Sequence, residues 1–369
     1  MFIEKLSLKN FRNYERTELA FTKNVNILIG NNAQGKTSLI EGIYALSTTK
    51  SHRTSKSNQM IRFDQDFAKA EAVIKIPSDD DELELGLVIA KKGKTAKYNG
   101  ANVAKLTDFV GRLKTVFFAP EDLELIKGSP SGRRRFLDMD IGQIDNLYLY
   151  HLSVYNKLLK QRNELLKHYV ESDMTQLQLE VLTSQLIPPL IYILNKRKWF
   201  LQELESHAKL VHHFITDGKE DISFEYISSM RIDEITEDSI LQKFESMYAV
   251  DKRTRTTNVG VHRDDFAVCL SGINAHEFAS QGQQRTAILS MRLAEIDLIH
   301  EETGVYPVLL LDDVLSELDE ARQSKLLTST NNKTQTFITT TSVAGIHQEI
   351  LDSADVFVVN DAIVGDYNE

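Results

Sequence analysis

The segment that most constrains this chain is Gly30-Asn31-Asn32-Ala33-Gln34-Gly35-Lys36-Thr37, which fits the pattern G-x-x-x-x-G-K-[ST]. Glycines let backbone N–H groups approach phosphate oxygens, and the N-terminus of a following helix adds positive potential. Lys36 supplies a charge for the β- and γ-phosphates, and the Thr37 hydroxyl can ligate Mg²⁺. An apolar run at 25–29 precedes the segment, and apolar residues at helical spacing follow it after Ser38. This strand–loop–helix order favours a phosphate-binding loop over an ordinary glycine-rich turn.

A pair of carboxylates, Asp312-Asp313, follows the apolar run Val308-Leu309-Leu310-Leu311. Taken alone, this pattern is equally compatible with a simple turn. A carboxylate at the carboxyl end of a central parallel strand lies beside a phosphate loop, where it can hold Mg²⁺. We therefore predict Asp312 as a metal ligand and Asp313 as the group that orients or deprotonates an attacking water.

A second surface for phosphate is predicted about thirty residues before Asp312, directly ahead of a helix. It consists of the sextet Ser280-Gln281-Gly282-Gln283-Gln284-Arg285. Small and amide side chains with a glycine at a helix N-terminus offer several hydrogen-bond donors. The alternative is an ordinary polar helix cap.

Composition excludes several classes of protein. The chain has 369 residues, which suits two or three domains, and 42% hydrophobic with 26% charged residues excludes a disordered or fibrous chain. Its 43 Lys and Arg against 53 Asp and Glu give a net charge of −10, which excludes a wholly basic coat protein but not local basic patches. A single cysteine, Cys269, cannot form an internal disulfide or a cysteine metal cluster.

No membrane segment or signal peptide is predicted. The longest apolar stretch, 186–194, contains Pro188-Pro189 and is far shorter than the roughly twenty residues of a span. The N-terminus, Met1-Phe2-Ile3-Glu4-Lys5, lacks the apolar core of a signal peptide. We therefore expect a cytoplasmic protein.

The chain divides into three regions by hydrophobic periodicity. The first third predicts strands with one helix, and the Asn99-Gly100 pair predicts a hairpin within an antiparallel meander. The block 136–250 has helical spacing, with a break or kink at Pro188-Pro189. The last third returns to alternating helix and strand. The predicted class is therefore α/β with an inserted helical lobe.

The order of these motifs resembles the ATP-binding-cassette (ABC) ATPases. The sextet at Ser280 resembles their signature motif, and Ser316-Glu317-Leu318-Asp319 resembles their D-loop. The opening run Leu8-Lys9-Asn10-Phe11-Arg12-Asn13-Tyr14 is typical of the SMC-like DNA-repair branch. Within that branch, four further runs are similar to the RecF family: 120–123, 127–130, 133–138 and 260–265.

This resemblance implies an ABC-type ATPase head, a P-loop NTPase fold with a mixed sheet and an antiparallel β subdomain, built from residues 1–135 and 251–369. Residues 136–250 would form an inserted α-helical lobe. The implied cofactors are ATP and Mg²⁺, with Thr37 and Asp312 as metal ligands and Lys36 and Asp313 as catalytic residues. The implied ATP-binding residues are Arg12, Gly30, Asn31, Asn32, Ala33, Gln34, Gly35, Lys36, Thr37, Ser38, Ser280, Gln281, Gly282 and Gln283.

The resemblance also implies partners. Two heads would sandwich two nucleotides in an ATP-dependent homodimer, with Ser280, Gln281 and Gly282 of one subunit facing the γ-phosphate bound to the other. RecF-family proteins bind double-stranded DNA in this form and work with RecR and RecO to load RecA at gaps. Hydrolysis of ATP would be slow.

Three features depart from the ABC pattern. Asp313 stands where many relatives have glutamate, so its shorter side chain predicts weaker contact with water. Pro120-Glu121-Asp122 stands where the glutamine loop is expected. The sensor position after Phe337-Ile338 is rich in threonine, and Thr340 is our first candidate for the missing γ-phosphate contact.

Four basic clusters are candidate DNA contacts, although a charge run is usually a solvated face. Little aromatic interleaving favours recognition of the duplex backbone over stacking on single strands. For the arginines at 133–135, pairing with carboxylates inside the fold is equally compatible with the sequence. The clusters are Lys50, His52, Arg53 and Lys56; Lys91, Lys92, Lys94 and Lys97; Lys127 and Arg133 to Arg135; and Lys252, Arg253 and Arg255.

Two other functions remain open at this point. A nucleotide-gated scaffold with little turnover is compatible with the short Asp313 side chain. The ATPase subunit of a membrane transporter fits less well, because a long helical insertion separates Lys36 from Asp312.

Overall fold

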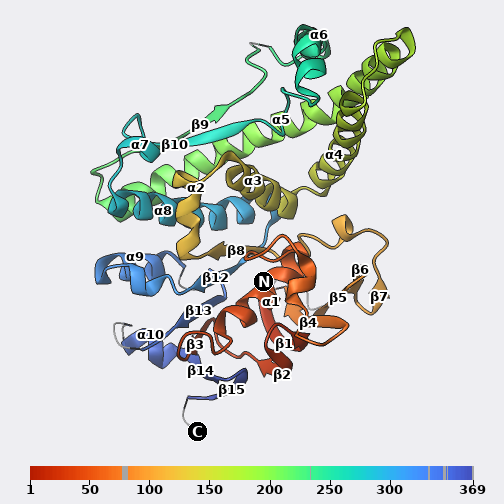
Figure 1. Cartoon of the computed structure of the whole chain (residues 1–369). Helices are drawn as coiled ribbons and strands as arrows, with labels where there is room; N and C mark the ends of the chain where they lie inside the picture. Colours follow the sequence, from red (N-terminus) through yellow and green to blue (C-terminus); the bar gives the residue numbers. More distant parts are fainter. Residues whose placement is uncertain (77–81, 233, 331–332, 344–345, 347, 368–369) are drawn as a thin grey trace. The chain divides into compact units, whose positions relative to one another are not determined.

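The computed structural model describes the chain except for residues 77–81, 233, 331–332, 344–345, 347 and 368–369 (Figure 1). The chain forms two compact units. The first, which we call the head unit, comprises Met1–Leu123, His207–Glu220 and Arg285–Glu369. The second, the helical unit, comprises Glu124–Ser206 and Asp221–Gln284. Each unit is therefore built from segments that are far apart in the sequence.

The central sheet of the head unit has the strand order β15-β14-β3-β13-β12-β8. Strands β14, β3, β13, β12 and β8 are parallel, and only β15 is antiparallel to its neighbour. All residues of β12 and β13 are buried, as expected for central strands of a parallel sheet. Their bounds are β3 Val25–Ile29, β8 Thr115–Phe118, β12 Val308–Asp312, β13 Thr336–Thr340, β14 Ala354–Asn360 and β15 Ile363–Asp366.

A second, antiparallel sheet of the head unit has the order β2-β1-β4-β5-β6-β7. Asn99 and Gly100 form the turn between β6 and β7 with φ values of 46° and 77°, which confirms the predicted hairpin. Helix α1 (Lys36–Thr48) packs on this sheet through its buried apolar residues. The strand bounds are β1 Phe2–Phe11, β2 Tyr14–Ala20, β4 Phe67–Lys75, β5 Glu82–Ala90, β6 Gly93–Tyr98 and β7 Ala101–Asn102.

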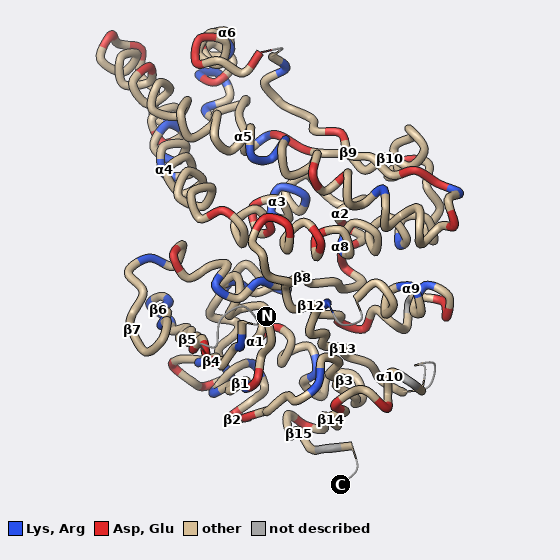
Figure 2. Tube along the Cα trace, turned by 180° about the vertical axis from the view of Figure 1, so that it is seen from behind, with Lys and Arg blue, Asp and Glu red and all other residues tan. Residues whose placement is uncertain are grey.

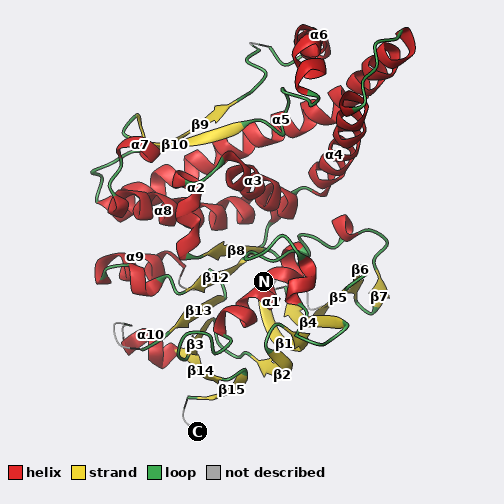
Figure 3. Cartoon of the chain, in the orientation of Figure 1, coloured by secondary structure: helices red, strands yellow, loops and turns green. Residues whose placement is uncertain are grey.

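In the head unit, helices connect strands of the central sheet that follow one another along the chain (Figure 3). Helix α9 (Glu320–Thr330) follows β12 and precedes β13, and α10 (Gln348–Ser353) precedes β14. Most of α8 (Gln281–Thr303) also belongs to this unit, and the residues that follow its first turn are largely buried.

The helical unit contains the predicted helices and one sheet that periodicity did not reveal. Its main helices are α3 (Pro130–Ile144), α4 (Asn146–Lys167), most of α5 (Asp173–Thr216) and α6 (Glu237–Thr254), with the short α2 (Glu124–Lys127) and α7 (Ala275–Phe278). The sheet has the order β11-β10-β9, with β9 at Ile222–Ile227, β10 at Asp265–Leu270 and β11 at Ile273–Asn274.

The compact units end at different residues from the predicted domains, which were 1–135 with 251–369 and 136–250. Pairing of β9 with β10 brings the segment after 250 into the helical unit. The last turns of α5 belong to the head unit instead, where Lys325 of α9 donates hydrogen bonds to Ile215 O (3.0 Å) and Asp217 (2.7 Å). Long-range pairing, which local periodicity does not encode, therefore sets the boundaries.

Helix α5 continues through Pro188 and Pro189, where the sequence predicted a break or kink. A proline removes a hydrogen bond to the carbonyl four residues earlier. Those carbonyls belong to Ser184 and Gln185, both exposed, so water can solvate them. The helix therefore continues despite the two prolines.

Helix α5 also meets a length and composition test for crossing a membrane, with a window mean hydropathy of 1.3. Of that window, 44% is buried inside the protein. Leu186, Leu190 and Ile193 of this helix are fully buried. A core helix passes the same test, so the test is weak evidence for a span.

Candidate nucleotide-binding site

The phosphate loop lies between β3 and α1, and its two glycines are required by its surroundings. A Cβ atom on Gly30 would lie 2.2 Å from the carbonyl oxygen of Val359 in β14. Gly35 has φ 120°, and a Cβ there would lie 2.8 Å from the Tyr14 hydroxyl. Both positions therefore exclude larger residues, as the motif predicts.

The turn between β14 and β15 braces the loop. The N–H of Asp361 donates to the Gln34 side-chain oxygen (2.6 Å), and the N–H of Ala362 donates to the Gln34 carbonyl (2.9 Å). Asn31, Asn32 and Ala33 at the tip of the loop are exposed. The loop is thus fixed at its end and open at its tip.

Lys36 points back along this loop. Its ammonium donates hydrogen bonds to the carbonyls of Gly30 (2.7 Å) and Asn31 (3.0 Å). Burial lowers its pKa below the ordinary lysine value, although the neighbouring Asp313 and Asp312 oppose this shift. A positive charge therefore lies on the concave side of the loop, where phosphate oxygens would gather.

Asp312 ends β12, which is separated from the loop strand β3 by β13 alone. Its Oδ1 accepts hydrogen bonds from the hydroxyls of Thr37 (3.0 Å) and Thr339 (2.7 Å). Burial raises the pKa of Asp312, while these two hydrogen bonds act in the opposite direction. The predicted metal ligands Thr37 and Asp312 are therefore in direct contact.

These donors fit Mg²⁺, which prefers oxygen ligands and is usually held by one or two carboxylates together with waters and substrate phosphates. Among the described residues there is no group of three or more His, Cys, Asp or Glu that could hold a metal. The Thr37–Asp312 pair thus suits an ion that also needs ligands from a nucleotide.

Asp313 adopts a left-handed backbone conformation, with φ 56°. This conformation costs free energy for residues other than glycine. Its N–H donates to the Thr339 hydroxyl at 2.9 Å, and its side chain lines the same cavity as the phosphate loop. Asp313 therefore lies beside the phosphate loop, and its role toward an attacking water stays a prediction.

Arg12 reaches the site from the end of β1. Its guanidinium makes two hydrogen bonds with the buried carboxylate of Glu41 in α1, at 2.7 and 2.5 Å, and a third with the Gln59 carbonyl at 2.7 Å. Burial alone would raise the pKa of Glu41, but hydrogen bonds from Arg12 and Ser51 outweigh it and lower that pKa. The ionised Glu41 therefore orients Arg12 beside the loop.

Arg12, Lys36, Thr37 and Asp313 line one cavity of about 770 Å³ in the head unit. It also includes a segment that the sequence analysis did not assign to the site, notably Arg62 and Phe63, whose ring is 88% exposed. A phenylalanine between two charged residues, Arg62 and Asp64, was the signal available in the sequence. The lining residues are Arg12, Asn13, Asn32, Ala33, Gly35, Lys36, Thr37, Ser38, Arg53, Gln59, Ile61, Arg62, Phe63 and Asp313.

The predicted signature motif lies at the N-terminus of α8, and all of it except Arg285 belongs to the helical unit. Ser280 Oγ accepts from the Gln283 N–H (3.3 Å), while Gln283 Oε1 accepts from the Ser280 N–H (2.9 Å). This reciprocal cap leaves Ser280, Gln281 and Gly282 exposed. The motif is therefore presented to solvent at the start of a long helix.

Comparison with known proteins identifies the family. A family model described as the RecF/RecN/SMC N-terminal domain matches residues 2–363. The DNA replication and repair protein RecF of Bacillus velezensis is 47% identical over 365 residues, which cover 97% of this chain and 98% of that protein. RecF of Bacillus subtilis (strain 168) is 46% identical and covers 99% of this chain and 100% of its own length. The chain belongs to the RecF family.

Solved structures support the same assignment. The recombination mediator protein RecF of the RecFOR pathway, solved with ATPrS, matches with a TM-score of 0.89 and 33% identity over 99% of this chain and 98% of its own. The Smc head domain of Pyrococcus furiosus matches with a TM-score of 0.54 and 15% identity, which indicates a common fold only. The predicted ABC-type ATPase head with a helical lobe is thus confirmed. This chain is an ATP-binding DNA replication and repair protein of the RecF family.

The four basic clusters of this RecF-family chain differ in the contacts that their side chains make. Arg133 pairs with Asp265 through two hydrogen bonds of 2.6 and 2.8 Å and is largely buried, and Arg134 donates to the Asp264 carbonyl at 2.8 Å. Arg133 therefore pairs with a carboxylate inside the fold, which was one of the two predicted alternatives for this cluster. In the fourth cluster, Lys252 lies over the Tyr169 ring and donates to Gln176.

The first two clusters meet in the head unit. The Lys94 ammonium donates to the carbonyl of Thr49 at 2.5 Å, beside the exposed Lys50. Burial lowers the pKa of Lys94, and the charge of Lys50 lowers it further. Arg53 and Lys56 are also exposed. Lys50 and Lys94, which are remote in the sequence, therefore lie close together, and we call the surface that they form the Lys50–Lys94 surface (Figure 2 colours Lys and Arg blue along the chain).

Proposed function

We propose that this protein is an ATP-dependent DNA-binding switch of recombinational repair and replication-fork recovery. ATP closes a homodimer that clamps double-stranded DNA, and slow hydrolysis to ADP and phosphate reopens it. With RecR and RecO, the clamped form promotes RecA loading at gaps. The observation that supports the switch most directly is the contact of Thr37 with Asp312 beside the phosphate loop. We expect this work to take place in the cytoplasm.

In this proposal the triphosphate lies in the cavity of the head unit. The loop residues Gly30 to Gly35 supply backbone donors, Lys36 turns from its own loop carbonyls toward the phosphates, and Arg12 adds charge from the other side. Thr37 and Asp312 would hold Mg²⁺, which neutralises charge on the phosphate oxygens. Asp313 accepts a proton from, or orients, the attacking water.

The second half of the ATP site comes from the partner subunit in this proposal. Ser280, Gln281, Gly282 and Gln283 are supported for this role by their position at the N-terminus of α8, where the helix dipole favours an anion. Because ATP would contact both subunits only in the closed dimer, it shifts the population toward that state.

Duplex DNA is proposed to contact the Lys50–Lys94 surface through its phosphates. Backbone contacts of this kind are independent of base sequence and weaken as salt rises. The Arg133 cluster is a poorer candidate because Arg133 already pairs with the Asp265 carboxylate and Arg134 donates to the Asp264 backbone carbonyl. A net-acidic chain can bind DNA in this way because phosphate contacts are local.

Sedimentation velocity of the purified protein with ATP, Mg²⁺ and a labelled duplex, across a salt series, tests the switch. We expect a dimer that carries duplex and loses it as salt increases. The variant Lys50→Glu should form the dimer but carry less duplex, whereas Lys219→Glu, an exposed lysine elsewhere on the head unit, should behave like the wild type. A protein that remains monomeric with ATP and ignores duplex would refute the clamp.

A further inference from the structure

Thr339 joins the two carboxylate residues that follow the apolar part of β12. It lies in β13, the strand between β3 and β12, and its side chain is completely buried. Its hydroxyl donates to Asp312 Oδ1 at 2.7 Å and accepts from the backbone N–H of Asp313 at 2.9 Å. One hydroxyl therefore contacts both Asp312 and Asp313.

The Thr339 hydroxyl acts as donor toward one partner and as acceptor toward the other. A threonine hydroxyl has a single hydrogen, and here Asp312 receives it. The oxygen then accepts a hydrogen bond from the Asp313 N–H. A series of two hydrogen bonds therefore leads from the Asp313 N–H through the Thr339 hydroxyl to the Asp312 carboxylate. Successive hydrogen bonds of this kind polarise one another in a buried site. Asp312 and the Asp313 backbone are thereby coupled.

The coupling matters because the backbone of Asp313 is in the left-handed region, with φ 56°. Aspartate tolerates that conformation better than most L-residues, but the conformation still costs free energy that a local hydrogen bond can offset. The hydrogen bond from Asp313 N–H to Thr339 is one such bond. It fixes the backbone from which the Asp313 side chain extends into the cavity.

We propose that Thr339 is the positioning residue of the hydrolytic site: its hydroxyl fixes the Asp312 carboxylate and the Asp313 backbone in the orientation that hydrolysis requires. This inference rests on the proposed ATPase function. Thr339 acts through Asp312 and Asp313, so its loss affects the chemical step more than ATP binding, which the phosphate loop and Lys36 provide.

The variant Thr339→Val tests the hydroxyl because valine has nearly the same shape. It leaves the Asp313 N–H without this acceptor and removes one of the two hydroxyls on Asp312 Oδ1. Thr339→Ser restores the hydroxyl. Thr336→Val is the matched control, since Thr336 is a buried threonine of the same strand whose hydroxyl bonds to Thr334 at 3.3 Å.

Three quantities would be measured for each variant. They are ATP affinity by equilibrium binding, single-turnover hydrolysis, and hydrogen exchange at the Asp313 amide in nucleotide-free protein. For Thr339→Val we expect hydrolysis to fall roughly 10- to 100-fold, the range for residues that orient metal and catalytic groups, with ATP affinity changed less than about threefold. Exchange at Asp313 should accelerate at least about tenfold. Thr339→Ser and Thr336→Val should resemble the wild type.

Normal hydrolysis and normal Asp313 exchange in Thr339→Val would overturn the proposal. So would an equal loss in Thr336→Val, or a loss that serine does not restore, because either result would indicate packing. If the valine variant fails to fold, Thr339→Ala is measured in the same way. The exchange measurement needs no ATP, so a wild type that does not hydrolyse ATP would refute the proposed function while Thr339 is still tested.

Discussion

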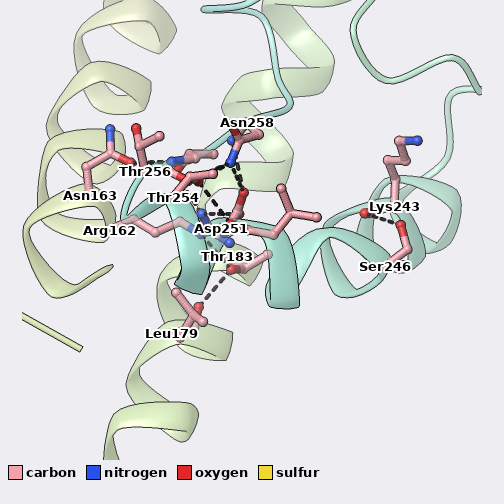
Figure 4. Close-up of polar contacts among 12 residues, drawn as sticks. Arg162, Asn163, Leu179, Thr183, Lys243, Ser246, Asp251, Thr254, Thr256 and Asn258 are labelled. Carbon is pink, nitrogen blue, oxygen red and sulfur yellow. Dashed lines mark hydrogen bonds and ion pairs between the residues drawn. The ribbon is translucent and has the colours of Figure 1, made fainter. Parts of the chain in front are cut away.

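Breaking the ion pair between Arg162 in α4 and Asp251 in α6 by removing one partner should strongly destabilise the helical unit. Both side chains are completely buried, and Arg162 Nη1 lies 2.9 Å from Asp251 Oδ2 (Figure 4). Arg162 also donates to the hydroxyls of Thr257 (2.6 Å) and Thr183 (3.1 Å). Asp251 Oδ1 accepts from the Asn258 N–H at 3.0 Å. The pair thus joins α4, α5, α6 and the segment after α6.

The variant Asp251→Ala leaves the guanidinium in the interior without its counter-charge. Breaking a buried pair by removing one partner costs about 3–5 kcal/mol, mainly because an uncompensated charge stays buried. An exposed pair is worth about 0–1 kcal/mol. Since neither side chain reaches solvent, we expect the larger figure for the loss in the free energy of unfolding. The double variant Arg162→Met, Asp251→Leu should recover much of that loss, because it buries no charge.

Urea unfolding followed by tryptophan fluorescence measures this loss of stability for the helical unit itself. The chain has one tryptophan, Trp199, and it lies in the part of α5 that belongs to the helical unit. Glu164→Ala is the matched control, because it removes an exposed ion pair with Lys167 from the same helix as Arg162. If Asp251→Ala cost no more than Glu164→Ala, the reasoning from burial would be wrong.

Three further variants address the nucleotide site. Lys36→Ala should abolish binding of a fluorescent ATP analogue, because the loop loses its only lysine; measurable affinity would contradict the phosphate-loop assignment. Asp313→Asn should retain ATP binding and trap the dimer in sedimentation, whereas unchanged turnover would show that another group positions the water. Phe63→Ala should weaken ATP binding by about 1–3 kcal/mol if the base stacks on its ring, with no effect on tripolyphosphate in calorimetry; an equal effect on both ligands would refute stacking.

The sequence was sufficient to locate the strands and the phosphate loop because their signals are local. Gly30, Gly35, Lys36 and Thr37 lie within one short segment, and the strands 25–29 and 308–312 are mostly apolar. Sheet pairing then confirmed the prediction that Asp312 lies beside the loop. Chemistry that depends on neighbouring residues in the chain was therefore readable without the fold.

Contacts between remote residues were not readable. Strand β9 is a six-residue segment between two helices, and its partner β10 follows about forty residues later, so periodicity assigned its surroundings to the helical block. The contacts of the predicted sensor residue Thr340 could not be predicted from the sequence either. Successive side chains of a strand point to opposite faces, and it is Thr339 that faces Asp312, whereas Thr340 donates to the Ser342 carbonyl. Thr340 as a γ-phosphate contact stays a prediction.

The division of the chain into two units separates two steps that the proposed function joins. The predicted triphosphate contacts Gly30 to Thr37, Asp312 and Asp313 all belong to the head unit, whereas Ser280 to Gln283 belong to the helical unit. Binding of ATP to a monomer should therefore need only the head unit, and closing of the dimer should need both. Ser280→Arg should accordingly retain ATP affinity while losing ATP-dependent dimers in sedimentation. A variant of the phosphate loop such as Lys36→Ala should instead lose ATP affinity itself. Loss of ATP affinity in the Ser280→Arg monomer would mean that the signature motif contacts nucleotide within its own subunit.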